Sequence, residues 1–475
     1  MIQLPTTLLL QNLQCTNIMK LGFPFLPPKR PPMAILRYLL ISFSLCFATP
    51  SFAQDSTPYT LPDNIRSENK LDNFYQKYTN ALGLPVIGSK NVSNNALDEA
   101  AWIVKQMLGH RKDILQAMKD TKVRIAVMAA NEYTTDVPEH SKLTPKLFWD
   151  RRARGLGATP SNPAVSCGEE NLLGFNRDPY PNENIFIHEF AHAIHGTGLN
   201  KTDPTFDPRL RLAFQSAIDR GLWKNTYAAT NHSEYWAEGV QCWFDDNAPP
   251  DALHNDIRTR EKLIAYDPTL AALCKEVFED FKWRYQRPRN RQPIDLAHLT
   301  AFDPTKLPKF QWRNTPLGES PKATIQTDLG DFDVVLDSKT APQATSLFLS
   351  IALDGGYHSG QFHLGHVHDQ NLKSGWIGAR TNNSWNTKQA TDADIKKIPP
   401  PKVPPTAGTI ALLQDDSNPG AFVIFLGSPP VDNLNFIPFG KVIKNPDILT
   451  KIFASPIKAD AFIKPIDIKR VIRTE

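Results

Sequence analysis

Two histidines in the segment His188-Glu-Phe-Ala-His192 are spaced so that both can bind one metal ion. Residues at i and i+4 lie on the same face of an α-helix, so both imidazole rings can reach a common point. Glu189 is displaced from His188 by about 100° around the helix axis. Its carboxylate therefore stays off the metal but can act as general base towards a water on it. The pattern indicates metal-assisted hydrolysis, and a buried helix with two structural histidines is the alternative.

A catalytic zinc ion needs a third protein ligand, which several downstream side chains could supply. The candidates are His195, Asp203, Glu234 and Glu238. Glu234 and Glu238 are four residues apart in an amphipathic pattern over residues 233–244, so one carboxylate could bind the metal while the other holds a histidine in place. The apolar side chains around these two acids predict that both are buried, and a solvated acidic face is the alternative.

The elements that would position these residues are mostly helices. Residues 96–119 and 207–223 carry apolar side chains at helical spacing, and residues 122–128 form a β-branched run that predicts a strand. We therefore expect a mainly helical metal-binding domain over residues 54–284. Six prolines recur in residues 285–322, which predicts a linker that is partly packed at best.

The segment Cys167-Gly-Glu-Glu-Asn171 lies between that strand and the histidine motif. We interpret it as a turn with solvated acids, and an edge strand beside the substrate is the alternative. After removal of an export signal, Cys167 remains together with Cys242 and Cys274. Three cysteines allow at most one internal disulfide in an oxidising compartment, and the sequence does not decide the pair.

The first 53 residues have the pattern of such an export signal. Arg37 follows Met33, an apolar run covers residues 38–48, and Ser51-Phe-Ala53 offers small residues for signal peptidase. This run is too short to span a bilayer comfortably. We predict translation from Met33, cleavage near residue 53, a periplasmic or secreted product, and no stable membrane insertion after cleavage. An uncleaved membrane anchor is the alternative.

Charge gives no reason to expect a nucleic-acid partner. The formal net charge is +4, and residues 1–54 hold four basic and no acidic side chains. The remaining chain therefore has balanced charges, whereas nucleic-acid binding favours a basic patch or stripe.

The segment from His188 to Phe244 resembles the catalytic core of the anthrax lethal factor-like zinc peptidases. That family has an HEFGH-type helix, and later a Tyr, two residues, Thr-Asn, two residues and a ligand Glu that leads into a helix of the form E-F-F-A-E. This chain has Tyr227-Ala-Ala-Thr230-Asn231-His-Ser-Glu234-Tyr-Trp-Ala237-Glu238. His195 is a departure, because relatives carry an acid at its position.

This resemblance implies a zincin-like domain that hydrolyses peptide bonds with a zinc-activated water. Its site would consist of zinc ligands, a general base, a hydroxyl that steadies the oxyanion, and an acid supporting the ligands. These roles fall on His188, His192 and Glu234 as Zn²⁺ ligands, Glu189 as base, Tyr227 as hydroxyl donor, and Glu238 as supporting acid.

Residues 323–452 resemble a cyclophilin-type peptidyl-prolyl isomerase, which implies a β-barrel domain over residues 323–475. Six pieces match in order and spacing: Thr324-Ile-Gln-Thr-Asp-Leu-Gly-Asp, Ala341-Pro342-Gln-Ala-Thr-Ser-Leu-Phe348, Gly356-Tyr357-His-Ser-Gly-Gln-Phe362-His363, Gly408-Thr-Ile-Ala-Leu-Leu, Phe422-Val-Ile-Phe-Leu-Gly427 and Phe439-Gly440-Lys-Val442.

The catalytic positions of that family are not matched in this chain. Leu364 stands where the family has an arginine that polarises the proline nitrogen, and leucine cannot donate a hydrogen bond. Ala421 and Val423 replace a glutamine and a phenylalanine, and Phe436 stands near the place of a histidine. We therefore predict a binding domain with little isomerase activity.

Together these patterns predict an α+β chain, with a mainly helical zincin-like domain followed by a cyclophilin-like β-barrel. The predicted function is an exported zinc peptidase that acts on a peptide or protein substrate. Two alternatives stay open: a non-catalytic peptide-binding scaffold, and a peptidyl-prolyl isomerase or chaperone with the first domain as accessory.

Overall fold

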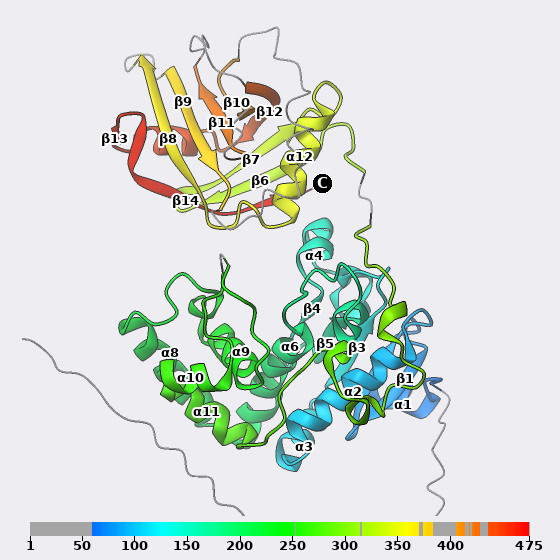
Figure 1. The fold of residues 1–475 in the computed structure, drawn as a ribbon. Helices are drawn as coiled ribbons and strands as arrows, with labels where there is room; N and C mark the ends of the chain where they lie inside the picture. Colours follow the sequence, from blue (N-terminus) through cyan, green and yellow to red (C-terminus); the bar gives the residue numbers. More distant parts are fainter. Residues whose placement is uncertain are drawn as a thin grey trace, which may run out of the picture. The chain divides into compact units, whose positions relative to one another are not determined.

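The computed structural model describes residues 59–251, 253–313, 316–369, 374–382, 405–413, 418, 420–427 and 436–474, in two parts of different architecture (Figure 1). The predicted export signal, residues 1–53, lies outside the described residues. None of the helices in the described ranges is long and apolar enough to cross a membrane.

A five-stranded sheet runs through the first part, residues 59–313. Strands β2, β3 and β5 run parallel, and β1 and β4 at the two edges run antiparallel to their neighbours. Every residue of β2 and of β5 is buried, as expected for parallel strands covered on both faces. The strand order is β1 (Lys77–Ala81), β2 (Leu84–Gly88), β3 (Arg124–Met128), β5 (Ala164–Gly168) and β4 (Gly155–Leu156).

The sequence predicted β3 but not the other strands. A buried strand of five residues has no polar alternation, so its pattern cannot be told from a piece of buried helix. The first part therefore combines helices with a sheet, which corrects the expectation of a mainly helical domain.

Eleven α-helices lie in the described residues of the first part. The helix predicted over residues 96–119 is two helices, α2 and α3, that separate at Gly109. The helix predicted over residues 207–223 ends at Asp219, before Gly221, which has a positive φ of 74°. The helices are α1 (Asp63–Asn69), α2 (Asn94–Leu108), α3 (Lys112–Asp120), α4 (Lys146–Arg152), α5 (Glu169–Leu173), α6 (Ile185–Ala193), α7 (Asn200–Thr202), α8 (Phe206–Asp219), α9 (His232–Trp243), α10 (Arg260–Tyr266) and α11 (Pro268–Phe278).

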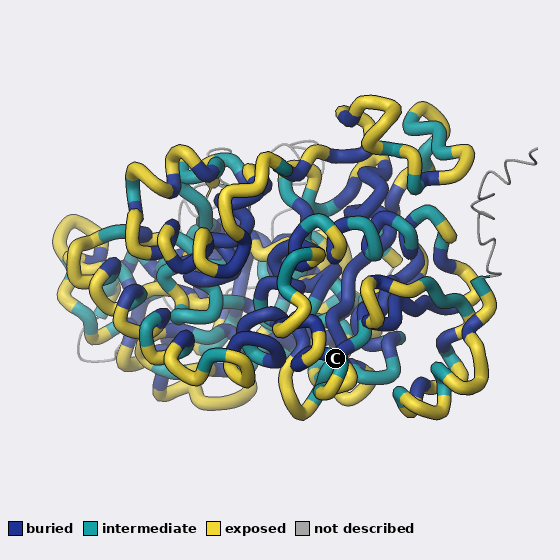
Figure 2. Tube along the Cα trace, turned by 90° about the horizontal axis from the view of Figure 1, so that it is seen from below, coloured by how far each residue is buried: buried dark blue, intermediate teal, exposed yellow. Residues whose placement is uncertain are grey.

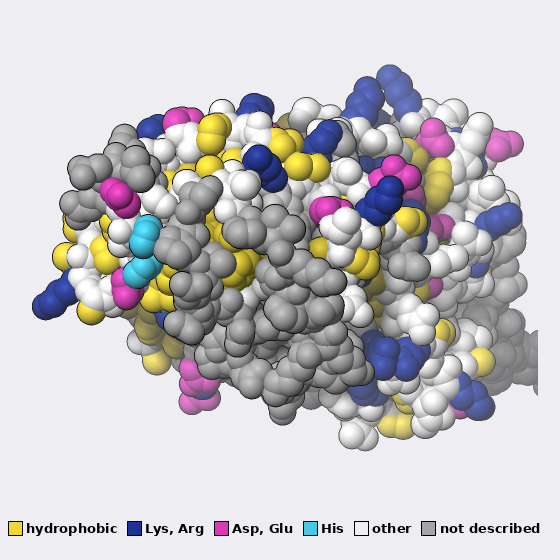
Figure 3. Space-filling view, turned by 90° about the horizontal axis from the view of Figure 1, so that it is seen from above, with side chains coloured by type: hydrophobic (Ala, Val, Ile, Leu, Met, Phe, Trp, Pro, Cys, Tyr) yellow, Lys and Arg dark blue, Asp and Glu magenta, His cyan; other side chains and the backbone are white. Residues whose placement is uncertain are grey.

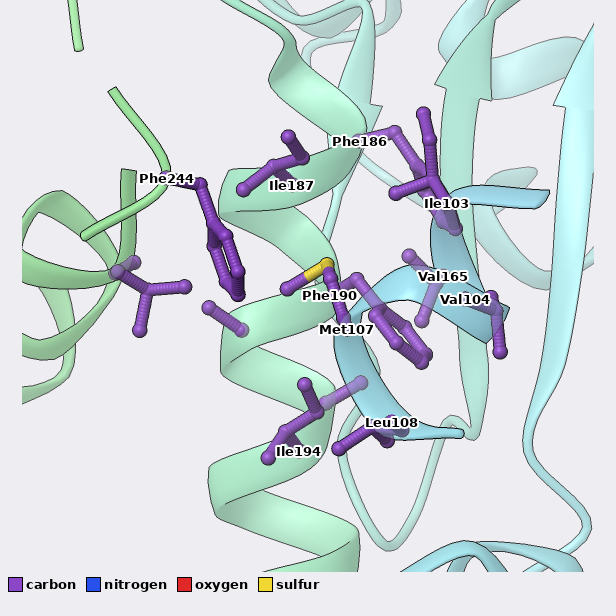
Figure 4. Packing of buried hydrophobic residues seen from close by; sticks show 14 of the residues in the cluster. Ile103, Val104, Met107, Leu108, Val165, Phe186, Ile187, Phe190, Ile194 and Phe244 are labelled. Atoms are coloured by element: carbon purple, nitrogen blue, oxygen red, sulfur yellow. The ribbon is translucent and has the colours of Figure 1, made fainter. Parts of the chain in front are cut away.

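The histidine-bearing helix α6 crosses the core of the first part. Its apolar side chains Phe186, Ile187 and Phe190 are buried and belong to one cluster with residues of α2 and β5 (Figure 4). Burial of one phenylalanine side chain contributes about 1.5–3 kcal/mol to stability, so this packing holds α6 firmly. In Figure 2 the buried residues, in dark blue, lie inside, and exposed turns and helix faces surround them.

Residues 285–313, predicted as part of a linker, pack on the first part. Arg291 donates to buried Glu99 of α2 at 2.9 Å, and Arg287 pairs with buried Asp178 at 2.9 Å. Phe310 is buried as well. Three prolines begin the short 3₁₀ turns η5 (Pro288–Asn290), η6 (Pro293–Leu296) and η7 (Pro304–Lys306). Buried ion pairs therefore anchor a proline-rich segment whose own apolar content is low.

The second part, residues 316–474, is a closed antiparallel barrel. Strand β14 pairs with β6 on one side and with β8 on the other, which closes the sheet. Burial alternates along β6 and β7, as expected when one face lines a core. The pairing order is β13 (Ile457–Lys458), β14 (Ala461–Arg473), β6 (Lys322–Thr327), β7 (Gly330–Leu336), β12 (Phe436–Lys444), β10 (Thr409–Leu413), β11 (Phe422–Leu426), β9 (Ser374–Arg380) and β8 (Gly360–Asp369).

Among the described residues of the second part, two helices accompany the barrel, α12 (Pro342–Leu353) and α14 (Asp447–Phe453). Both contribute buried apolar residues to the core that the strands enclose. On the face seen in Figure 3, the described Lys and Arg side chains are spread among acidic and uncharged ones, so this face offers no continuous basic surface.

Candidate metal centre

Local hydrogen bonds set the start of α6 and thereby the direction of its histidines. The side chain of Asn184 caps the helix by accepting from the backbone N–H of Ile187 at 3.2 Å. The backbone N–H of Asn184 is itself held by the buried carboxylate of Asp246 at 2.9 Å. Asn171 accepts from the N–H of Ile185 at 2.8 Å. These contacts tie the first turn of α6 to two other segments of the domain.

A second capped helix, α9, brings Glu234 to the same place. Asn231 accepts from the backbone N–H groups of Ser233 at 2.9 Å and Glu234 at 3.0 Å. This cap accounts for the asparagine in the Thr-Asn pair of the sequence motif. Trp236 in α9 donates to the carbonyl of Ala191 in α6 at 2.9 Å, which ties the two helices together.

The side chains of His188, His192 and Glu234 converge on one point. The distance from His188 Nε2 to His192 Nε2 is 3.1 Å, and these two nitrogens lie 3.1 and 3.2 Å from Glu234 Oε2. Three ligands at tetrahedral positions around zinc are about 3.3–3.6 Å apart, given bond lengths of about 2.0–2.2 Å. The observed edges of 3.1–3.2 Å are slightly shorter than this, so small outward shifts of the three side chains would give the separations of a tetrahedral zinc site.

The chemistry of the donor set also fits zinc, because two imidazoles and one carboxylate leave a fourth position open. Among the residues that the structure describes, this is the one group of three His, Cys, Asp or Glu side chains whose ligand atoms lie within 4.8 Å of one another. The other proposed third ligands lie elsewhere: His195 contacts Asp207 at 3.0 Å, and Asp203 pairs with Arg209 at 2.7 Å.

Gln241 determines which nitrogen of His188 faces the centre. His188 Nδ1 donates to Gln241 Oε1 at 2.8 Å, so the lone pair of Nε2 is free for a metal. Gln241 in turn donates to Glu183 at 3.0 Å. Glu238, which was predicted to hold a histidine, lies 3.6 Å from His188 Nδ1, beyond hydrogen-bond distance.

Sequence reasoning missed Gln241, although a signal existed. Gln241 follows Glu234 by seven residues, two helical turns along the same face of α9. Glu238 accepts from Asn247 at 3.0 Å and lies 3.9 Å from His254. Its carboxylate therefore adds negative charge next to the hydrogen bond between His188 and Gln241.

The electrostatic potential at the centre is negative. Burial would lower the pKa of His188, but its hydrogen bond to Glu234 and the charges of nearby carboxylates raise it to about 10. Burial alone would raise the pKa of Glu234, and its contacts with both histidines hold it well below its usual range. A site that draws positive charge onto an imidazole also favours a cation.

Glu189 and Tyr227 lie beside the three converging side chains. Burial raises the pKa of Glu189, and the charges of His188 and His192 oppose this rise. The ring centroid of Tyr227 is 6.1 Å from that of His188, and burial raises the pKa of its hydroxyl. The structure therefore brings all five residues predicted for the chemistry to one place.

The edge strand β4 runs directly along α6 because glycines let the two backbones approach. A Cβ atom on Gly155 would lie 2.9 Å from Cγ of Glu189. A Cβ atom on Gly157 would lie 2.7 Å from Cβ of His192. A side chain at Gly155 would therefore clash with Glu189, and a side chain at Gly157 would clash with His192.

The segment Cys167-Gly-Glu-Glu-Asn171 is buried, so its interpretation as a solvated turn is wrong. Glu169 accepts from the backbone N–H groups of Ser93 at 2.7 Å and Ala130 at 2.9 Å. Glu170 pairs with Arg154 at 2.6 Å, and both side chains are fully buried. The acids hold the sheet to α2 and to the start of β4. Cys167, Cys242 and Cys274 are all buried and free.

In the barrel, the position that lacks the expected arginine lies in a row of small and apolar residues. Leu364 of β8 pairs with Gly378 of β9, and Gly378 pairs with Val423 of β11. Val423 in turn pairs with Ala411 of β10. Phe436 packs in one buried cluster with Ala411 and Val423. Three of the departures predicted from the sequence therefore lie close together on neighbouring strands.

Comparison with known proteins identifies the second part. Residues 322–473 match the family described as cyclophilin type peptidyl-prolyl cis-trans isomerase/CLD. A solved cyclophilin type peptidyl-prolyl cis-trans isomerase from Cryptosporidium parvum is 19% identical, with 33% of this chain and 98% of that chain covered and a TM-score of 0.26. A structure of that protein in the presence of the dipeptide Ala-Pro is 20% identical, with coverages of 32% and 99% and a TM-score of 0.25. No curated protein matches the chain.

Residues 322–473 thus form a cyclophilin-type domain, whose described residues build a closed barrel of eight long strands and one short one.

Proposed function

We propose that residues 59–313 form a zincin-like, zinc-dependent peptidase. The observation that carries this proposal is the triangle of two imidazole nitrogens and one carboxylate oxygen, with edges of 3.1–3.2 Å. Hydrogen bonding of His188 to Gln241 supports it, because this contact presents the ligand nitrogen of His188. The flanking Glu189 and Tyr227 supply the groups that hydrolysis of a peptide bond requires.

His188, His192 and Glu234 would hold the zinc ion. When bound, zinc supplies Lewis-acid polarisation and activation of water at neutral pH. Glu189 takes a proton from the attacking water and later delivers it to the leaving amine. The hydroxyl of Tyr227 donates a hydrogen bond to the oxyanion that develops on the scissile carbonyl.

The test is the zinc content of the purified chain from residue 54, measured in wild type, Glu234→Ala and Asp203→Ala. Asp203 is the matched control, because it is an acid of the same domain that pairs with Arg209 and not with a histidine. We expect about one zinc per chain in wild type and in Asp203→Ala, and a large loss in Glu234→Ala. A wild-type chain that takes up no zinc when zinc is offered would refute the peptidase.

We propose that the cyclophilin-type domain binds proline-containing peptides and isomerises them poorly. The family match favours a peptide ligand. Leu364 favours weak turnover because, unlike the arginine of the family pattern, it cannot donate a hydrogen bond to the proline nitrogen. The full chain should show proline-peptide binding with little acceleration in a prolyl isomerisation assay. Isomerisation as fast as that of an active cyclophilin would establish the isomerase alternative instead.

We also propose that the chain is exported, on the strength of its N-terminal pattern alone. Intact mass of the protein recovered outside the cytoplasm should correspond to a chain that begins near residue 54. Recovery of the chain with its first 53 residues intact would contradict cleavage.

A further inference from the structure

Arg152 is a charged residue beside the metal centre that sequence reasoning did not single out. It is the last residue of α4 and is exposed. Its guanidinium is near enough to the hydroxyl of Tyr227 and to the carboxylate of Glu189 to interact with both. The hydroxyl of Tyr180 donates to the carbonyl of Arg152 at 2.7 Å, which fixes the end of α4 at this place.

Arg152 differs from the other arginines of its segment in having no fixed partner for its charge. Arg154 is fully buried and is neutralised by Glu170 at 2.6 Å. Arg151 lies with its guanidinium 4.5 Å from the ring centroid of Trp312. Among the described residues, no carboxylate forms an ion pair with Arg152. An exposed guanidinium with free N–H groups next to a reaction centre is suited to a group of the ligand.

We propose that Arg152 binds a carboxylate of the peptide substrate, which is either the C-terminal carboxylate or an acidic side chain next to the scissile bond. This inference rests on the peptidase function proposed above and specifies its substrate class. The guanidinium has five N–H donors in a planar fork, so one can contact Tyr227 while two others take a carboxylate in a bidentate pair.

The position of Arg152 limits where the carboxylate lies in the substrate. The Arg152–Tyr227 contact and the contact of Tyr227 with the oxyanion each span about 3 Å. The guanidinium therefore lies within about 6 Å of the scissile carbonyl oxygen. An extended peptide advances about 3.3 Å per residue, so the recognised carboxylate lies within two residues of the cleaved bond.

A competing role is purely positional. Arg152 could do no more than hold the hydroxyl of Tyr227 so that its proton points to the substrate. Loss of Arg152 would then slow the hydrolysis of all peptides equally. If Arg152 recognises a carboxylate, its removal instead weakens only the binding of peptides that carry this carboxylate. The weaker binding can then be measured in a protein that does not cleave the peptide.

The experiment uses the full chain with Glu189→Gln, loaded with zinc, so that bound peptide is retained. A random hexapeptide library is prepared once with free C-termini and once as C-terminal amides, and retained peptides are identified by mass spectrometry. The same selection is run with Glu189→Gln/Arg152→Gln and, as matched control, with Glu189→Gln/Arg151→Gln. The control removes an arginine from the same helix turn and leaves the centre intact.

We expect enrichment of at least 10-fold for free acids over amides, or for Glu over Gln at one position. The first result assigns the C-terminal carboxylate and the second an acidic side chain. The enrichment should disappear with Arg152→Gln and persist with Arg151→Gln. Three results would overturn the proposal. The first is equal retention of acids and amides together with equal retention of Glu and Gln, the second is retention of no peptide, and the third is an enrichment that persists with Arg152→Gln.

Zinc content of each variant separates this outcome from failure of the peptidase. A protein that holds no zinc refutes the proposed metal centre. A zinc-loaded protein that retains acids and amides equally, and Glu and Gln equally, leaves the peptidase standing and removes only the role of Arg152.

Discussion

Replacement of Gln241 by leucine tests whether the metal centre depends on the orientation of His188. Gln241 is fully buried, and its side chain accepts from His188 Nδ1 at 2.8 Å and donates to Glu183 at 3.0 Å. Leucine has a similar volume but can neither accept nor donate. His188 can then rotate or change tautomer, so its Nε2 lone pair is no longer held towards the centre.

The expected loss of zinc affinity is about 10- to 100-fold, the usual effect of removing a partner that orients a metal ligand. This corresponds to about 1.4–2.7 kcal/mol of binding free energy. The free energy of unfolding of the zinc-free chain should also fall by about 1–3 kcal/mol, because a buried N–H of His188 loses its acceptor.

Competition with a chromophoric chelator measures the affinity, and denaturant unfolding of the zinc-free protein measures the stability. Gln241→Glu is the informative companion, because it keeps an acceptor for His188 and should bind zinc within a few-fold of wild type. Gln215→Leu is the control on an exposed face of α8, where the glutamine contacts Asp219. A folded Gln241→Leu variant with unchanged zinc affinity would refute the role of Gln241.

Three further predictions concern the general base, the barrel and a buried histidine. Glu189→Gln should keep its zinc and lose hydrolysis of any peptide that wild type cleaves, so retained turnover would contradict the mechanism. Leu364→Arg should not restore prolyl isomerisation, because Ala421 and Val423 are unchanged, and a clear gain in rate would show the barrel needs only that arginine. Burial lowers the pKa of His195 to about 4, so between pH 6.5 and 4 the unfolded chain binds more protons than the folded one. The free energy of unfolding should therefore decrease as the pH is lowered from 6.5 to 4, by at most about 1.4 kcal/mol per pH unit. Denaturant unfolding should show a smaller decrease in His195→Gln. Equal slopes in the two proteins would contradict the assignment.

Local sequence was sufficient for the helices that carry the candidate ligands. The i and i+4 spacing of His188 and His192, and the amphipathic pattern around Glu234, depend only on helical periodicity. The barrel was predicted because pieces that match the cyclophilin family recur in order along residues 324–442, and the family match covers residues 322–473. The helical signal lies within a short stretch of chain, whereas the barrel signal consists of short pieces whose order and spacing agree with the family.

The sheet of the first part and the packing of residues 285–313 could not be read locally. β2 and β5 are buried on both faces and have no alternation that distinguishes them from buried helix. The proline-rich segment is held by Arg287 and Arg291, whose partners Asp178 and Glu99 are about 110 and 190 residues away. A pattern search along the chain cannot pair charges across such separations.

By itself, the sequence determined which residue types are present at helical spacing and therefore which chemistry is available. Residue spacing left four candidate third ligands open, and the resemblance of residues 188–244 to a peptidase family favoured Glu234. The tertiary structure places the Glu234 carboxylate beside both histidines because the Asn231 cap and the Trp236 contact set the position of α9 against α6. It also revealed Gln241 and Arg152, because an orienting partner and an unpaired charge are defined by neighbours in space and not by neighbours in sequence.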